Sequence, residues 1–121
     1  MSQTKAIHVH HAIDYIEFAV TDVAMAKAFY AKTFGWTFHD YGPDYAGIQG
    51  VEREVGGFRK EKAVKTGGPL VVLHSNDLDA TLNKVRKHGG SIVTEPFEFP
   101  GGRRFHFRDP SGNELGVWSE R

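Results

Sequence analysis

The chain has 121 residues, of which 40% are hydrophobic and 25% are charged, and these values are typical of one globular domain. Lys plus Arg and Asp plus Glu number 15 each, so charge gives no support for a nucleic-acid or acidic-membrane partner. The absence of cysteine excludes disulfides, thiolate metal sites and a cysteine nucleophile, and no apolar run approaches the roughly 20 residues that span a bilayer. We therefore expect a cytoplasmic protein with no membrane partner.

Residues 1–12 form a polar amino-terminal tail that carries the histidines His8, His10 and His11. Imidazole is the commonest metal ligand, but a terminal segment is also where unconstrained residues gather. The tail is expected to be frayed or to extend the first strand, and metal binding is the alternative.

The first strand is predicted over residues 15–20, where side chains alternate between an apolar face and a face that carries Tyr15 and Glu17. The spacing then becomes helical after Asp22, whose carboxylate can cap the first turn. Gly35 can adopt the left-handed conformation that ends a helix. This strand and capped helix form the unit that the rest of the chain repeats.

Three further strands are predicted over residues 36–41, 45–50 and 55–59. The last two are rich in glycine, which indicates a bulge or a place where a ligand or a second backbone approaches closely. Residues 61–68 carry several charges and end in two glycines, so they are expected to be a linker.

The second half repeats the pattern of the first. A strand is predicted over residues 69–75, and a capped helix follows from Asp77 to Gly90. The remaining strands are expected at residues 91–93, 103–108 and 114–119, and Asp109-Pro110-Ser111-Gly112 has the composition of a type I turn between the last two. Two copies of one supersecondary unit best explain this self-similarity.

The doubled pattern resembles the vicinal oxygen chelate superfamily, which includes glyoxalase I, bleomycin-resistance proteins and extradiol dioxygenases. The resemblance rests on Val-Thr-Asp, Phe-Tyr and Phe-Gly-Trp within residues 20–36, and on Phe-Arg-Asp-Pro-Ser-Gly-Asn at residues 107–113. It implies an α+β fold in which two βαβββ modules form an eight-stranded, cup-shaped mixed sheet with the helices outside. The expected single domain spans residues 13–121, with module one at 13–60, the linker at 61–68 and module two at 69–119.

The family's metal enzymes carry ligands on the first and last strand of each module, usually His or Gln first and Glu last. The corresponding positions in this sequence are Tyr15, Leu70 and Gly116, and the fourth falls in the glycine-rich stretch at residues 55–58. Leucine and glycine side chains have no donor atom for a metal. We therefore expect no metal cofactor at the family's usual positions.

Alternation of side chains along the strands predicts which residues face the cup, and it assigns Phe105 and Phe107 to the opposite, core face. Glu17 is the candidate catalytic residue, because a carboxylate within an apolar strand is costly to bury unless it is paired or protonated. It can act as a general base, hold a donor group of a ligand, or serve as a structural partner for Arg104, His106 or a backbone amide. The candidate ligand-binding residues are Tyr15, His74, Arg104, His106, Glu114 and Trp118.

The leading hypothesis is a protein that binds a small, mostly apolar organic molecule and acts by sequestration or by metal-free acid/base chemistry. The second is a metal-dependent glyoxalase-like lyase or dioxygenase-related enzyme, with a divalent metal on the relocated ligands Glu17, His74, His106 and Glu114. The third is a noncatalytic module that serves mainly to dimerise. A homodimer is expected from the resemblance and from open sheet edges.

Overall fold

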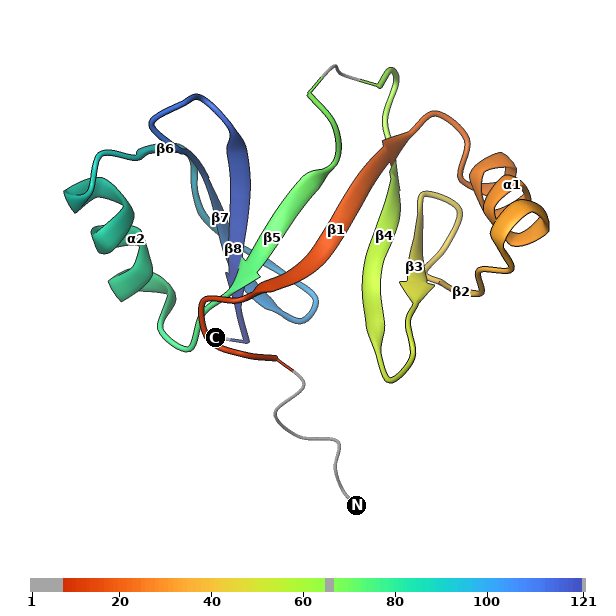
Figure 1. The fold of residues 1–121 in the computed structure, drawn as a ribbon, viewed down its shortest axis with the longest axis horizontal. Coiled ribbons are helices and arrows are strands. Elements are labelled where there is room, and N and C mark those ends of the chain that lie inside the picture. Colours follow the sequence, from red (N-terminus) through yellow and green to blue (C-terminus); the bar gives the residue numbers. More distant parts are fainter. Residues whose placement is uncertain (1–7, 65–66, 121) are drawn as a thin grey trace. The chain divides into compact units, whose positions relative to one another are not determined.

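The structure is a computed structural model that describes residues 8–64 and 67–120. Within these ranges, eight strands and two helices follow one another as two βαβββ modules (Figure 1). The first module contains β1 (Ile13–Val20), α1 (Val23–Phe34), β2 (Phe38–Asp40), β3 (Tyr45–Gln49) and β4 (Glu54–Lys60). The second contains β5 (Leu70–His74), α2 (Leu78–Lys87), β6 (Ser91–Phe99), β7 (Gly102–Arg108) and β8 (Glu114–Ser119). The predicted α+β class with two βαβββ modules is confirmed.

The chain divides into two compact units. The first unit is Tyr15–Pro69, and the second unit is Leu70–Arg121 together with Met1–Asp14. Strands of the first unit lie in the order β2-β3-β4-β1, with β1 parallel to β4 and the other neighbours antiparallel. Strands of the second unit lie in the order β5-β8-β7-β6, with β5 parallel to β8 and the other neighbours antiparallel. The two units therefore share one topology, as the repeat in the sequence predicts.

Both helices begin at the predicted capping residues. The carboxylate of Asp22 accepts a hydrogen bond from the backbone N–H of Met25 at 2.9 Å, and Asp77 accepts one from Ala80 at 3.1 Å. Each bond satisfies a donor that the first helical turn leaves without a partner. Gly35 ends α1 with φ at 74°, in the left-handed region that glycine adopts without strain.

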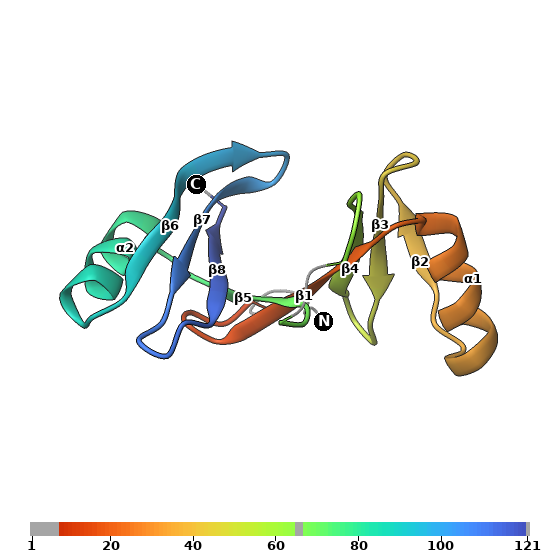
Figure 2. The ribbon, with the colours of Figure 1, turned by 90° about the horizontal axis from the view of Figure 1, so that it is seen from above.

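An aromatic cluster forms the core between α1 and the sheet of the first unit. Phe58 is fully buried on β4, and its ring centroid lies 5.8 Å from Phe18, 5.5 Å from Phe38 and 5.5 Å from Tyr30 of α1. Figure 2 shows α1 flanking its own sheet, which places this cluster on the helix side. Because successive residues of a strand face opposite sides, Glu17 lies on the face away from α1.

The core of the second unit lies between α2 and its sheet. Leu78 and Leu82 of α2 pack with Phe105 and Val117, and all four side chains are buried. This confirms the predicted assignment of Phe105 to the core face of β7. Its sequence neighbours on β7 therefore point to the other face.

Two strands differ most from their predicted extents, and the others agree with them to within two residues at each end. β6 continues to Phe99, and its pairing with β7 shifts register between Ile92 and Phe97, which allows the strand to pass through Pro96. β2 begins only at Phe38, and the ring of Trp36 stacks on Tyr30 at 4.6 Å. Both differences arise from packing that a local pattern of residues does not reveal.

The three histidines of the amino-terminal segment each bond to a residue of the second unit. His8, His10 and His11 pair with, respectively, the Asp14 carboxylate at 2.8 Å, the Asn76 backbone N–H at 2.8 Å and the Thr81 hydroxyl at 3.0 Å. β1 begins at Ile13, earlier than the predicted start at residue 15, and these bonds hold residues 8–12 ahead of it, so a frayed end is not seen there. Residues 1–7 of the predicted tail and residues 65–66 of the predicted linker lie outside the described residues.

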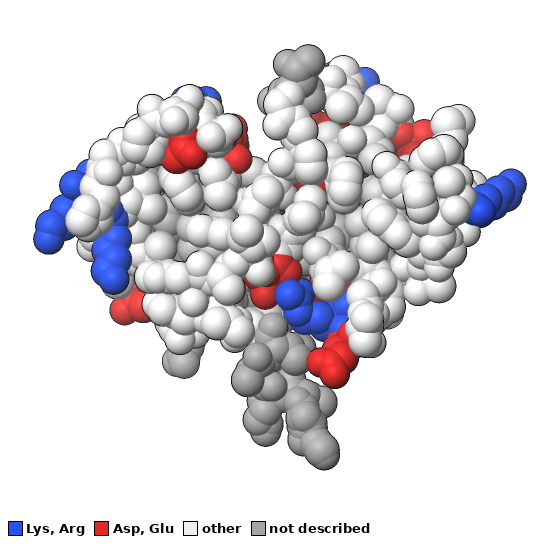
Figure 3. All heavy atoms as spheres, viewed as in Figure 1, with Lys and Arg blue, Asp and Glu red and all other residues white. Residues whose placement is uncertain are grey.

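Basic groups are dispersed on the face of the described residues that Figure 3 draws. On the face that Figure 3 draws, Lys and Arg side chains lie in separate places rather than in one continuous patch. Neither α1 nor α2, the helices of the described ranges, is long and apolar enough to cross a membrane.

Candidate functional site

Glu17 is buried in the middle of the first unit's sheet. Its side chain is part of a residue with only 4% of its surface exposed. In the parallel ladder between β1 and β4, Glu17 lies opposite Gly57, and Gly57 lies opposite Gly47 of β3. Paired residues share a face, so the positions beside Glu17 on β4 and β3 are glycines, which leave space above the sheet.

A chain of hydrogen bonds holds the buried carboxylate. The Tyr45 hydroxyl donates to Glu17 Oε2 at 2.9 Å, and Arg59 Nε donates to Glu17 Oε1 at 3.1 Å. The hydroxyls of Tyr15 and Tyr45 are 2.5 Å apart, and Arg59 Nη1 donates to Glu61. We call the five residues Tyr15, Tyr45, Glu17, Arg59 and Glu61 the Glu17 chain. It links four charged or hydroxyl groups to one carboxylate on the face that sequence analysis assigned to ligand binding.

Gly57 makes room for this chain. A Cβ atom on Gly57 would lie 2.2 Å from the Tyr45 hydroxyl oxygen and 2.6 Å from the Tyr15 hydroxyl oxygen, closer than real Cβ contacts. Gly47 makes room in the same way for the carboxylate of Glu54, which accepts a hydrogen bond from Tyr41. The predicted bulge is present as a register shift between Ile48 and Gln49, whereas the atoms that approach Gly47 and Gly57 are polar side chains of the unit itself rather than a ligand or a second backbone.

Burial raises the pKa of both tyrosines of the chain. Burial raises the pKa of Tyr15 to about 12, and the negative charge of Glu17 contributes in the same direction. Burial followed by the charge of Glu17 also raises the pKa of Tyr45. Both hydroxyls therefore carry a proton at neutral pH.

A second buried carboxylate, Asp14, lies in the second unit. Asp14 is 5% exposed and accepts hydrogen bonds from Trp118 Nε1 at 2.9 Å and from His8 Nδ1 at 2.8 Å. The ring of His74 lies 5.0 Å from Trp118 and 5.3 Å from His8. The rings of Trp118 and His74, two of the candidate ligand-binding residues, thus lie close together, and Trp118 is held by Asp14, a residue that the sequence did not single out.

The other predicted residues of the second unit form separate pairs. His74 is buried and donates from Nε2 to Glu120 at 2.8 Å, whereas His106 donates from Nδ1 to Glu114 at 3.1 Å. Burial opposes the charged form of Glu120, but its hydrogen bond from His74 lowers the pKa of that carboxyl below the ordinary value. The guanidinium of Arg104 lies over the ring of Phe97 at 5.4 Å.

The residues at the family's metal positions do not fit a metal ion. Tyr15 has its hydroxyl bonded to Tyr45, and Leu70 and Gly116 have no donor atom in their side chains. The last strand of module one, whose position the sequence left unaligned, presents Gly57 opposite Glu17. Within residues 8–64 and 67–120, no three or more His, Asp or Glu side chains come together as a metal site, and this covers His74 and His106.

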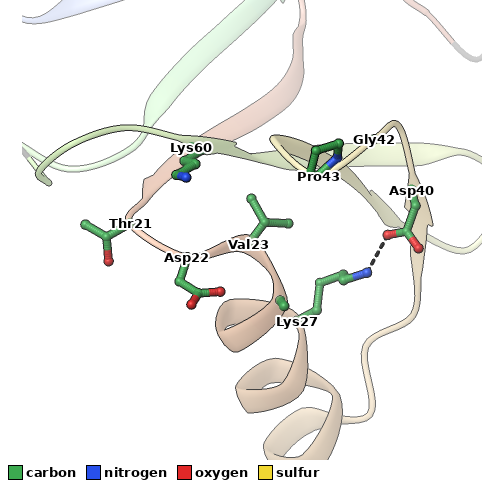
Figure 4. A pocket seen from close by; sticks show the side chains of 9 residues that line it. Thr21, Asp22, Val23, Lys27, Asp40, Gly42, Pro43 and Lys60 are labelled. Atoms are coloured by element: carbon green, nitrogen blue, oxygen red, sulfur yellow. Dashed lines mark hydrogen bonds and ion pairs between the residues drawn. The ribbon is translucent and has the colours of Figure 1, made fainter.

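The first unit also contains a surface hollow of about 470 Å³ beside the start of α1 (Figure 4). Its wall includes an ion pair between Lys27 Nζ and Asp40 Oδ1 at 2.5 Å. None of the predicted site residues lines it. The hollow is lined by Thr21, Asp22, Val23, Ala24, Lys27, Asp40, Gly42, Pro43 and Lys60.

Sequence reasoning missed Tyr45 as a partner of Glu17, and it missed Arg59 and Asp14 entirely. Arg59 lies two residues after Gly57 on β4, so the two residues share a face. Once the register of the ladder is known, this places Arg59 on the Glu17 face. Tyr45 begins the glycine-rich strand β3 and lies opposite Arg59. The signal that could have identified both residues is an arginine on the strand next to the buried acid, with a tyrosine opposite the arginine on the following strand.

Replacement of Gly57 by Ala is expected to disturb the Glu17 chain. The added Cβ meets the two tyrosine hydroxyls, and overpacking of this kind lowers the free energy of unfolding by about 1–3 kcal/mol. Gly116→Ala is the matched control, because its Cβ would make only ordinary contact with His106 at 3.5 Å. Urea denaturation of both variants is the measurement, and equal stability of the two variants would contradict the close approach at Gly57.

Alkaline pH is expected to weaken the first unit through Tyr15. Because its folded pKa of about 12 exceeds the ordinary 10.0, folding favours the protonated hydroxyl. This contribution to stability is complete below the unfolded pKa and is lost as pH rises through the folded pKa. The wild-type protein should therefore lose more stability than Tyr15→Phe between about pH 10 and 12. Parallel urea titrations across this range would refute the assignment if the two proteins lost stability equally.

Comparison with known proteins gives the family. The model of the Glyoxalase/Bleomycin resistance protein/Dioxygenase superfamily matches residues 12–117. The anthracycline biosynthesis protein DauV of Streptomyces sp. (strain C5) is 28% identical over 97% of this chain and 44% of its own length, so the chain spans less than half of that relative. A glyoxylase-like domain-containing protein of Didymella fabae is 28% identical over 90% of this chain and 94% of its own.

Among solved structures, the Mn(II)-bound glyoxalase from Novosphingobium aromaticivorans aligns with a TM-score of 0.69 and 27% identity. The alignment covers 92% of this chain and 39% of that one. Two independent kinds of comparison, of sequence and of fold, thus agree with the doubled βαβββ topology. The chain belongs to the Glyoxalase/Bleomycin resistance protein/Dioxygenase superfamily.

Proposed function

We propose that the chain binds a small, largely aromatic organic molecule on the Glu17 face of the first unit. The observation that carries this proposal is a carboxylate with 4% exposure, held by Tyr45 and Arg59 on glycine-rich strands. A buried ion pair contributes little net stability compared with apolar packing, so a network of this kind is a candidate for function. Aromatic and hydroxyl groups of the face suit a flat ligand with polar substituents.

The curated relatives support the same class of ligand. DauV is named for anthracycline biosynthesis, and anthracyclines are flat aromatic molecules that carry hydroxyl groups. We extend this only to the class of molecule, since the chain covers 44% of DauV. The ligand that we propose is therefore a hydroxylated polycyclic aromatic compound.

Sequestration suits the geometry of Glu17 better than acid/base chemistry does. Both carboxylate oxygens already accept a hydrogen bond, one from Tyr45 and one from Arg59. A ligand that binds to the Tyr15 hydroxyl requires no change in these two bonds. General-base action would require Glu17 to release one of its donors first.

We further propose that binding needs no metal at the family's usual positions. Leu70 and Gly116 offer no side-chain ligand there, and the Tyr15 hydroxyl is bonded to Tyr45. The alternative, a metalloenzyme with relocated ligands, requires His74 and His106 to leave the carboxylates that they now bond to.

The balanced charge and the dispersed basic groups on the face that Figure 3 draws give no support for a nucleic-acid partner. The cysteine-free composition suits a reducing compartment such as the cytoplasm.

Homodimerisation through α1 is a separate proposal. Met25, Phe29 and Phe34 of α1 are 69%, 55% and 62% exposed. Large apolar side chains gathered on one helix mark an interaction surface, and a second copy of the chain is the partner that the family resemblance suggests.

Glu17→Leu tests the binding proposal. Loss of the carboxylate is expected to weaken binding of an anthracycline by about tenfold or more, because Tyr45 and Arg59 lose their common acceptor. Folding should persist, because the Arg59 side chain is 42% exposed and keeps its ion pair with Glu61 when the Glu17 carboxylate is removed. Titration monitored by the ligand's own fluorescence is the measurement, and Glu95→Leu, at an exposed ion pair, is the control.

The same titration in the presence of a chelator addresses the metal. Unchanged affinity is expected if the face binds its ligand directly. Loss of binding on chelation would favour the metalloenzyme. Unchanged affinity in Glu17→Leu together with reduced stability would assign Glu17 a structural role only.

Phe29→Asp tests the dimer. A charge on the apolar side of α1 should shift the protein toward the monomer in sedimentation velocity, because burying an unpaired carboxylate at an interface is costly. Val51→Asp, at a fully exposed position outside α1, is the control and should leave the association unchanged. A wild-type protein that sediments as a monomer would reject this proposal.

A further inference from the structure

The hydrogen bond between Tyr45 and Glu17 has a fixed direction. The Tyr45 hydroxyl has one proton and donates it to Glu17 Oε2 at 2.9 Å. The other oxygen of Glu17 accepts from the guanidinium of Arg59, so the carboxylate acts as an acceptor on both sides. The proton of Tyr45 is therefore committed to Glu17.

The direction of this bond also determines the direction of the hydrogen bond between Tyr15 and Tyr45. The hydroxyl oxygens of Tyr15 and Tyr45 are 2.5 Å apart, a distance that requires one proton between them. Because the proton of Tyr45 points to Glu17, Tyr15 must donate to Tyr45. The contact to Tyr45 is the one hydrogen bond of the Tyr15 hydroxyl within the described residues.

Tyr15 consequently offers only lone pairs to a molecule that approaches it. A phenolic tyrosine has one donor and can also accept, and here the donor is already used. A ligand that places a carbonyl or ether oxygen against Tyr15 would bring two acceptors together and leave both without a proton. A ligand hydroxyl at the same place would complete the chain.

We propose that the Glu17 chain selects ligands that present a hydroxyl donor, such as a phenol or an enol, to the Tyr15 oxygen and rejects carbonyl and ether groups there. This selectivity rests on the proposed function and narrows its ligand class. Tyr15 is the residue that touches the ligand, and Glu17, Tyr45 and Arg59 are positioning residues that set the direction of the chain.

The direction of the chain can be reversed by one substitution. In Glu17→Gln, the guanidinium of Arg59 keeps the amide oxygen on its own side, so the amide NH₂ faces Tyr45. Tyr45 then accepts from the amide and donates to Tyr15 instead. The proton of Tyr15 is released toward the ligand, and the face becomes a donor to carbonyl groups.

The test measures the affinity of three matched probes, which are naphthol, its methyl ether and acetylnaphthalene, by calorimetry or fluorescence. For the wild-type protein we expect naphthol to bind about tenfold more tightly than either of the other two. In Glu17→Gln the ratio of acetylnaphthalene to naphthol affinity should rise by about tenfold. In Tyr15→Phe the preference for naphthol over its ether should disappear, which separates the hydroxyl from the size of the probe.

The outcomes distinguish this inference from the proposal beneath it. Equal binding of naphthol and acetylnaphthalene to the wild-type protein would overturn the donor selectivity and leave the binding function in place. Absence of binding by all three probes and by anthracyclines would overturn both. Should Glu17→Gln fail to fold, the wild-type ratio and Tyr15→Phe decide the matter, and Glu95→Gln serves as the control for the chemical change.

Discussion

The burial of one carboxylate determines the arrangement of the whole Glu17 face. An ionised side chain with 4% exposure requires compensating donors, and Arg59 supplies a charged one while Tyr45 supplies a neutral one. These donors reach Glu17 because β1 runs parallel to β4, which brings residues of distant sequence into one ladder. Gly57 then has to lack a side chain, since the tyrosine hydroxyls occupy the space above it. The arrangement and the polarity of the face follow from this single desolvated charge, and the ligand preference that we propose rests on it.

Much of the fold could be predicted from local pattern. Asp22 and Asp77 are seen to cap their helices, and the alternation around Phe105 correctly assigned the core face of β7. Capping and alternation depend on neighbours within a few residues, so the sequence displays them directly. The resemblance to the family predicted the doubled topology for the same reason, because its motifs lie at helix ends and turns.

The partners of the candidate residues could not be predicted in this way. Arg59 meets Glu17 only through the register of a parallel ladder, and the glycines of β4 remove the alternation that would have shown it. The pairing of Asp14 with Trp118 joins the first strand to the last. His10 and His11 look unconstrained in the sequence because their partners are Asn76, just before α2, and Thr81 of α2. Contacts of long sequence separation are the part that requires coordinates.

A crystal structure of the protein with a bound hydroxylated aromatic ligand tests the account most directly. The account predicts the ligand on the glycine-rich face of the first unit, with its hydroxyl within hydrogen-bonding distance of the Tyr15 oxygen and with Glu17 still bonded to Tyr45 and Arg59. A metal ion between the ligand and the protein, or a ligand bound elsewhere with the Glu17 face untouched, would contradict it.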